Sequence, residues 1–170
     1  MKILRTLICA ILFASIHFCL SGQNVDSLMN AGLKLQQKYK FQEAIAVYQK
    51  VLDIRPNDPN GMYQKALCHM RNSEPQEALS IFLRLTGVRP DFVGGFYGAA
   101  TAYSSLENYP KTIEYIEKAM EFEPKNHEYY MVRGQAYANM GDNKRACKDF
   151  KTAKKLGNRH AKFSMQKYCK

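Results

Sequence analysis

The stretch that decides the fold is VLDIRP at residues 51–56, which returns as LTGVRP at residues 85–90 and as AMEFEP at residues 119–124. Each phrase closes on a proline, and successive prolines lie 34 residues apart. Similarity at a fixed period of roughly 20 to 50 residues indicates a repeat architecture. Outward from these prolines, the sequence divides into four units at 25–58, 59–92, 93–126 and 127–158, the last with Asn158 in place of proline.

Three columns of the repeat bear on how each unit folds. When the proline is numbered 32, positions 8 and 20 are small and position 24 is large and apolar. A small residue on one helix opposite a small residue on another lets two helices pack closely. Position 20 is Ala44, Ala78, Thr112 and Ala146. Position 8 is Gly32, Ala66, Ala100 and Gly134, and position 24 is Tyr48, Phe82, Ile116 and Phe150.

This pattern resembles the tetratricopeptide-repeat (TPR) family, of the small exported bacterial type, over residues 25 to about 158. The resemblance implies an all-α fold, a right-handed solenoid of four helix-turn-helix repeats. Helices of about 13 residues are marginal alone in water, so each must pack on its neighbours. We expect the domain to cover 23–170 and to end in a capping helix at 160–169, because a terminal repeat needs a solvated cap.

Local signals predict where two of the helices begin. Asp58 precedes Pro59, which gives an N-cap residue followed by proline at the first helical position. Ser73 stands three residues before Gln76, the spacing of a capping box. We therefore expect helices to start close to Pro59 and Ser73.

The first 22 residues have the composition of a secretory signal peptide. Lys2 and Arg5 precede an apolar run of about 14 residues, too short to span a bilayer, and small residues follow. Gln23 stands where a lipoprotein would need a cysteine. We predict an exported protein, located in the periplasm or at the cell envelope, that is not transmembrane after cleavage of residues 1–22.

Positive charge is concentrated at the C-terminal end. Residues 23–126 hold 12 basic and 12 acidic side chains, whereas residues 127–170 hold 11 basic and 3 acidic ones. Such asymmetry concerns partners rather than fold. A solvated helix face is one interpretation, and attraction to an anionic envelope surface or an acidic protein is the other. The predicted basic surface consists of Lys144, Arg145, Lys148, Lys151, Lys154, Lys155 and Arg159.

Cys147 and Cys169 lie at equal distances, 11 residues, on either side of Asn158. In an antiparallel helix hairpin, equal arms place two residues at the same height. An oxidising compartment permits a disulfide between them. The alternative is a pair of separate reduced thiols. Cys68 occupies a core position of its repeat and is predicted to be a free buried thiol.

No pattern in the sequence indicates catalysis. The three histidines after residue 22 fall at unrelated repeat positions, and metal-ligand spacings such as Cys-x-x-Cys are absent. We therefore predict a protein that is not an enzyme, with no catalytic residues, no metal and no cofactor. We also expect no nucleic-acid partner, because no basic-aromatic recognition motif is visible.

The TPR resemblance implies a partner-binding groove lined by the first helix of each repeat. Basic residues of the kind that hold a C-terminal carboxylate are missing from these columns, whereas methionine and tyrosine suit an apolar peptide. The alternative is that these side chains partly fill the groove themselves. The predicted groove residues are Met29, Leu33, Tyr63, Leu67, Met70, Tyr97, Thr101 and Met131.

The resulting functional hypothesis is a non-catalytic protein–protein interaction scaffold or adaptor of the bacterial envelope. Its expected partner is a protein or peptide segment bound in the concave groove. Two alternatives are a structural subunit of a larger envelope complex and a binder of anionic surfaces through the basic end. A regulator of an enzyme, or a hydrolase whose site forms only in the folded groove, also stays open.

Overall fold

The computed structural model describes residues 24–169, so the predicted signal peptide lies outside the described residues. This part of the chain is all-α and contains no strand. A helix over residues 24–37 comes first, and eight more follow it within the same part. They are α2 (Phe41–Ile54), α3 (Pro59–Arg71), α4 (Pro75–Val88), α5 (Val93–Ser105), α6 (Tyr109–Phe122), α7 (His127–Asn139), α8 (Asn143–Lys155) and α9 (Ala161–Tyr168).

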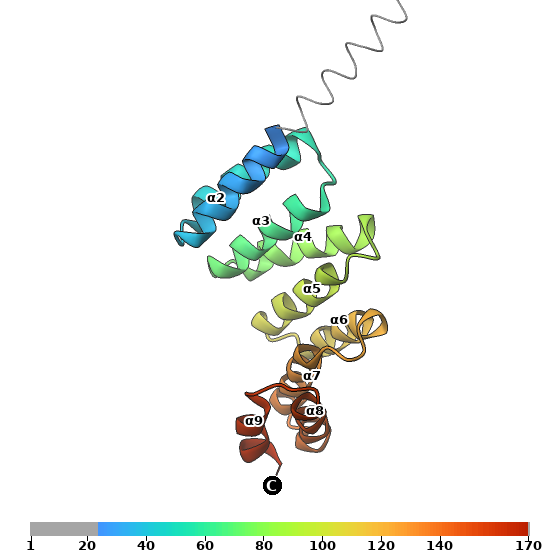
Figure 1. Cartoon of the computed structure of the whole chain (residues 1–170). Helices are drawn as coiled ribbons and strands as arrows, with labels where there is room; N and C mark the ends of the chain where they lie inside the picture. Colours follow the sequence, from blue (N-terminus) through green and yellow to red (C-terminus); the bar gives the residue numbers. More distant parts are fainter. Residues whose placement is uncertain (1–23, 170) are drawn as a thin grey trace, which may run out of the picture.

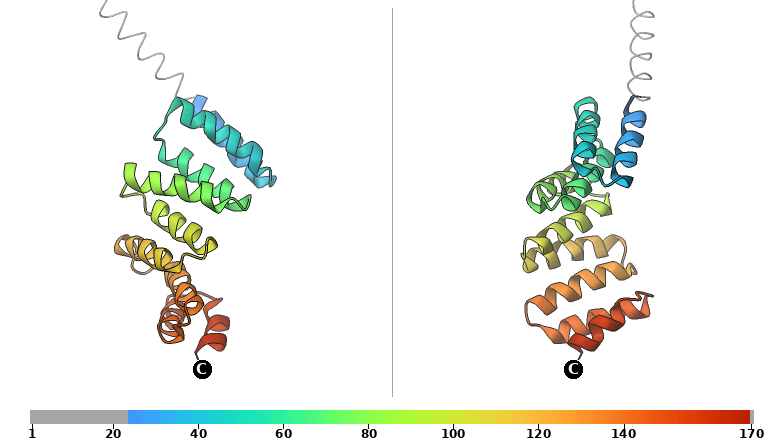
Figure 2. Two further views of the ribbon diagram at one scale, coloured as in Figure 1. Left: turned by 180° about the vertical axis from the view of Figure 1, so that it is seen from behind. Right: turned by 90° about the vertical axis from the view of Figure 1, so that its left-hand side faces the viewer.

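The helices stack as antiparallel hairpins in chain order, which confirms the predicted α-solenoid (Figure 1). Each helix packs mainly on the helices before and after it in the chain. First helices of successive repeats also contact each other, α3 with α5 and α5 with α7, whereas second helices have no comparable contacts in the described chain. The stack therefore curves, with the first helices on its concave side. Figure 2 shows the same succession of layers from two further directions.

Small residues of the first helices pack against the bulky residues at position 24 to build the core. The four residues at position 24 are all fully buried, and so are Ala66 and Ala100 at position 8. A Cβ atom placed on Gly32 would lie 2.5 Å from the ring of Tyr48. A Cβ atom placed on Gly98 of α5 would lie closer still to the ring of Phe82, so this phenylalanine packs against two successive repeats. Helix packing here requires small residues at these places.

Both predicted helix starts lie close to the observed ones, Pro59 and Pro75, but only the first has the predicted cap. The Asp58 carboxylate accepts a hydrogen bond of 2.8 Å from the Gly61 amide, and α3 begins at Pro59. The capping box at Ser73 was wrong, because the residue that precedes α4 is Glu74 and its side chain makes no cap hydrogen bond. Ser73 instead has a φ of 60° and closes the turn between α3 and α4. A left-handed turn residue cannot also serve as an N-cap.

The same left-handed turn occurs in every repeat, always at position 15. Tyr39, Ser73 and Glu107 have φ values of 59°, 60° and 59°, and Gly141 has a φ of 82°. Only the fourth repeat uses glycine, the residue that adopts this conformation without steric cost.

The fourth repeat is joined to its neighbours by polar contacts. Arg133 on α7 makes two hydrogen bonds to the carboxylate of Asp149 on α8, at 2.9 and 3.0 Å, and a third of 3.0 Å to Glu117 on α6. Asn158, which stands in place of the repeat proline, accepts hydrogen bonds from the amides of His160 and Ala161 at the start of α9. Its amide group also donates to Glu128 on α7. Asn158 therefore binds the first amides of α9 from the preceding turn and ties this helix to α7.

Candidate functional site

The predicted groove residues lie on the first helices, but they differ in how far they are open to solvent. Met29 is half-buried against the cluster formed by Ala44, Ile45 and Tyr48. Leu33, one turn later, is 38% exposed. The N-terminal end of the concave face therefore offers one apolar side chain to a partner while its neighbour supports the core.

On α3 the predicted residues partly fill the groove. Tyr63 lies between two phenylalanine rings, 6.0 Å from Phe82 and 5.4 Å from Phe92 between centroids. Leu67 and Met70 are partly buried against the same core cluster. Burial raises the pKa of the Tyr63 hydroxyl. These side chains mainly pack one repeat against the next, and only a part of their surface is open to a ligand.

Tyr97 of α5 is in a similar position. Its ring lies 5.4 Å from that of Tyr129. Burial, followed by the negative charge of Glu128, raises the pKa of the Tyr97 hydroxyl. The alternative interpretation of the groove, in which its own side chains occupy it, therefore describes the tyrosine positions well.

The open part of the concave face lies between α5 and α7. A hollow of about 400 Å³ is lined there by residues of both helices, and it contains the predicted Thr101 and Met131. A second hollow of about 270 Å³ adjoins it and contains the predicted Met70. Ser105 belongs to both hollows, so they form one shallow groove across three repeats. Besides these residues, the first is lined by Ser104, Ser105, Val132 and Gln135, and the second by Ser73, Pro75 and Ser105.

The polar groups of this groove are held in place by local bonds. The Thr101 hydroxyl donates a hydrogen bond of 2.8 Å to the carbonyl of Gly98, so its oxygen can still accept a hydrogen bond. The Gln135 amide nitrogen donates to Asn139 at 2.8 Å, so its carbonyl oxygen stays available. The groove can thus offer acceptors to backbone amides beside the apolar Met131. Sequence reasoning missed Ser105 and Val132, which fall outside the family's groove columns.

The predicted basic residues separate into three groups. Arg145 is bound locally, 2.5 Å from the carboxylate of Asp142 and 4.3 Å from the ring centroid of Tyr137. Arg159 lies apart, in a hollow of about 260 Å³ beside Asn158. Five lysines form the third group and lie along α8. We call these five the α8 lysines, and they are Lys144, Lys148, Lys151, Lys154 and Lys155.

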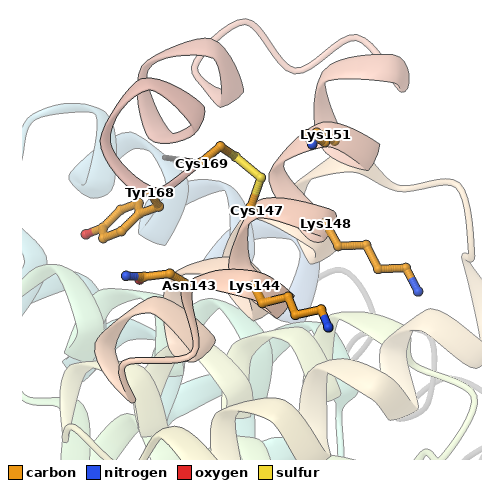
Figure 3. A pocket seen from close by; sticks show the side chains of 7 residues that line it. All are labelled: Asn143, Lys144, Cys147, Lys148, Lys151, Tyr168 and Cys169. Atoms are coloured by element: carbon orange, nitrogen blue, oxygen red, sulfur yellow. A yellow bond between two sulfur atoms is a disulfide. The ribbon is translucent and has the colours of Figure 1, made fainter.

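The α8 lysines line two hollows along the boundary between α8 and α9. The first, of about 470 Å³, is lined by Lys144, Lys148 and Lys151 (Figure 3). The second, of about 330 Å³, shares Lys151 and adds Met165 of α9. The two hollows are therefore continuous through Lys151. The remaining lining residues are Asn143, Cys147, Tyr168 and Cys169 in the first hollow, and Lys154 and Lys155 in the second.

None of the α8 lysines forms an ion pair within residues 24–169, since no carboxylate lies within 4.0 Å of their amino groups. The one acidic residue of α8, Asp149, is buried and bonded to Arg133. Positive charge on this face is consequently uncompensated, and it attracts anions.

Cys147 and Cys169 lie side by side in the floor of the first hollow (Figure 3). Their sulfur atoms are 2.08 Å apart and their Cα atoms 5.1 Å apart. The third cysteine of the described chain, Cys68, is buried and unpaired. Burial raises the pKa of its thiol to about 11, so it stays protonated at neutral pH.

Within residues 24–169, no group of three or more His, Cys, Asp and Glu side chains is placed to hold a metal ion. None of the helices in that same part of the chain is long and apolar enough to cross a membrane.

Two family models match the sequence. The model of anaphase-promoting complex, cyclosome, subunit 3 matches residues 37–119, and a tetratricopeptide-repeat model matches residues 127–157. No curated protein is significantly similar in sequence. With the repeat architecture described above, these matches identify the class: the chain is a tetratricopeptide-repeat protein.

Solved structures share this fold at low sequence identity. The TPR protein TTC0263 of Thermus thermophilus is 18% identical, with a TM-score of 0.73 over 85% of this chain and 80% of that one. MamA of Desulfovibrio magneticus RS-1 is 17% identical, with a TM-score of 0.75 over 84% of each chain. YrrB, described as a TPR protein with an unusual peptide-binding site, is 19% identical, with a TM-score of 0.67 over 82% of this chain and 75% of that one. At these identities the likeness concerns the fold alone.

Proposed function

We propose that this protein is a non-catalytic scaffold of the bacterial cell envelope that binds a segment of a partner protein in its concave groove. TPR proteins bind protein or peptide partners. The observation that carries the proposal is the groove between α5 and α7, where Met131 lies beside the hydrogen-bond acceptors of Thr101 and Gln135. An extended segment needs both apolar contacts and partners for its backbone. The peptide-binding site named for YrrB is a precedent within the same fold.

The test is photo-crosslinking in cells that express the protein. A photoreactive residue replaces Ser105 or Gln135 in the groove, and in a control it replaces Glu121, which is exposed on the second helix α6. We expect the same crosslinked partner from both groove positions and none from the control. A partner that crosslinks equally from Glu121, or no product from either groove position, would contradict the proposed groove.

Export to the envelope is the second part of the proposal. It is supported by the signal-peptide composition of residues 1–22. Cell fractionation followed by N-terminal sequencing tests it. We expect the protein in the periplasmic or membrane fraction, with a new N-terminus close to Gln23. A cytoplasmic protein that retains Met1 would rule the location out.

We also propose that Cys147 and Cys169 are oxidised to a disulfide in the mature protein. Their adjacency suits a bond, and an exported protein meets an oxidising compartment. Thiol counting on the denatured, unreduced protein checks this. One reactive thiol, from Cys68, is expected before reduction and three afterwards. Three thiols before reduction would mean that the pair is reduced.

A second candidate function is the binding of an anionic partner or envelope surface through the basic C-terminal end. The observation that favours it is the α8 lysines, none of which forms an ion pair among residues 24–169. This function uses other residues than the groove does, although the two sites adjoin, because Gln135 of the groove lies 3.5 Å from the hydroxyl of Tyr168 at the α8–α9 boundary.

A further inference from the structure

The spacing of the α8 lysines is regular. Lys144, Lys148, Lys151 and Lys155 follow one another at intervals of four, three and four residues. At 3.6 residues per turn these intervals keep all four on one stripe of the helix, about 5.5 Å apart on average along its axis. The stripe runs beside the two joined hollows at the α8–α9 boundary. Figure 3 shows the Lys144 and Lys148 side chains pointing to the same side.

This arrangement is unfavourable for the helix itself. Like charges three or four residues apart repel, at a cost of about 0.2–0.5 kcal/mol for each pair. The stripe contains such pairs in succession, for example Lys144 with Lys148 and Lys151 with Lys155. On α6, by contrast, Lys111 and Lys118 each lie three or four residues from Glu114 and pair with its carboxylate. A row of anions bound along the stripe would remove the repulsion.

We propose that the boundary between α8 and α9 binds an extended acidic segment of a partner protein, with carboxylates at alternate residues. This proposal rests on the second candidate function above and deepens it. Alternate side chains of an extended chain lie on one face, about 6.6 Å apart. Flexible lysine side chains cover the difference of about 1 Å from their own spacing.

The walls of the boundary favour a peptide over a flat anionic surface. The lysines open into hollows with an apolar side, formed by Met165 and Tyr168 of α9. The exposed aromatic residue of α9, Phe163, is 73% exposed, but it stands two residues from Met165 and so on a different side of the helix. A membrane surface that used both the lysines and Phe163 would have to contact two different sides of this end of the molecule at once. A narrow chain needs only the boundary.

The experiment measures binding of a fluorescein-labelled 12-residue peptide, in which Glu and Ser alternate, to the protein as purified from expressing cells. The variant Lys148→Glu/Lys151→Glu reverses two charges of the stripe. The control Lys34→Glu/Lys38→Glu changes the net charge equally on an exposed part of the first repeat. We expect the dissociation constant to rise at least ~10-fold in the stripe variant and less than ~2-fold in the control, since ~1.4 kcal/mol corresponds to tenfold.

Loss of folding cannot explain the expected result. The introduced glutamates lie four residues from Lys144 and Lys155, where opposite charges stabilise a helix. The stripe variant should therefore unfold at the same temperature as the parent or above it. Equal weakening in both variants would overturn the proposal and the second candidate function together, because binding would then follow net charge alone.

Two further arms separate the peptide from other anions. A peptide of the same composition with six Glu in one block places only half of them on one face, and we expect it to bind several-fold more weakly. Vesicles of one-third phosphatidylglycerol provide the lipid arm. If the protein sediments with these vesicles through the same lysines while the alternating peptide does not bind, the acidic-segment proposal is overturned but the second candidate function stands. If the block peptide binds as tightly as the alternating peptide, the proposal that the segment binds in an extended conformation is also overturned.

Discussion

The second repeat, α3–α4, and the fourth, α7–α8, have nearly the same length but differ in what they pack against. Phe82 of the second repeat lies in one cluster with Ala66 from α3 and with Ala99 and Ala102 from the following repeat. The fourth repeat has a full repeat on one side only. On its other side Phe150 packs near Met165 and Tyr168 of the short helix α9, and polar contacts of Arg133 and Asn158 join the repeat to α6 and α9. An interior repeat can bury apolar surface against full repeats on two sides, whereas this terminal repeat has a smaller apolar partner and adds polar contacts to it.

The largest expected effect is in the interior. Phe82→Ala removes a fully buried ring that lies in one cluster with residues of α3 and α5. We expect a loss of about 3 to 5 kcal/mol in the free energy of unfolding, measured by urea denaturation. Phe163→Ala is the control, because that ring is 73% exposed, and its effect should stay within about 0.5 kcal/mol. A loss below ~1.5 kcal/mol for Phe82→Ala would mean that the interior does not depend on apolar packing.

The ion pair of the fourth repeat comes next. Arg133→Met leaves Asp149, which is only 4% exposed, without its bidentate partner. Removal of one member of a buried pair is strongly destabilising, and we expect about 3 kcal/mol in the same urea experiment. The double variant Arg133→Met/Asp149→Leu should recover a large part of this loss, since no charge is then left uncompensated. Equal instability of single and double variants would show that the ion pair is not what anchors this repeat.

Reduction of the cysteine pair tests the covalent part of the comparison. A bridge between Cys147 and Cys169 spans 22 residues, and a bond of this kind contributes about 2 to 3 kcal/mol. We expect reductant to lower the melting temperature and to increase hydrogen exchange first in α9. The variant Cys147→Ser/Cys169→Ser should not respond to reductant. If the parent protein also fails to respond, α9 is held by its packing alone.

The cap of α9 should have an intermediate effect. Asn158→Ala removes the acceptor for two backbone amides and the donor to Glu128. We expect a loss of about 1 to 2 kcal/mol, comparable to the loss of an N-cap. Glu128→Ala is the informative control, because it removes the acceptor on α7 but leaves Asn158 bonded to the amides of α9. Stability of Glu128→Ala close to that of the parent would locate the effect in the amide contacts of α9, and stability close to that of Asn158→Ala would locate it in the contact with α7.

The interior could be predicted from the sequence because its information is local and periodic. The small and bulky columns, and the Asp58-Pro59 start of α3, each depend on residues inside one repeat. The groove was harder to foresee. Whether Tyr63 is open to a ligand depends on Phe92, which approaches it from the following turn, and whether Tyr97 is open depends on Tyr129 in the next repeat. Such contacts follow from the curvature of the whole stack, which no single repeat encodes.

The terminal repeat was difficult to predict for another reason. Its basic residues look equivalent in the sequence, but the structure gives them different roles. Arg145 is bound to Asp142, and Arg133 is half-buried and bound to Asp149. The α8 lysines have no carboxylate partner among residues 24–169. Only the side of the helix on which each residue falls separates these roles. The departure of Asn158 from the repeat pattern was the visible signal of the cap, because a polar residue in place of proline can accept the amides of the next helix.

The smallest effect is expected from substitutions in the turns, where the interior repeats differ from the fourth. Position 15 is left-handed in all four, but it is Glu107 in the third repeat and Gly141 in the fourth. In this conformation a residue with a side chain is about 1 kcal/mol or more less stable than glycine. Part of the advantage of glycine is lost because glycine has more conformational freedom in the unfolded chain. Because the Glu107 side chain is exposed, Glu107→Gly should stabilise the protein by about 0.5 kcal/mol, whereas Gly141→Ala should destabilise it by about 1 kcal/mol. Urea denaturation of the two variants side by side measures both signs. If both changes destabilise the protein, contacts of the side chain at position 15 stabilise the turns of the interior repeats. The left-handed backbone conformation shared by the four turns would then not decide how stable each turn is.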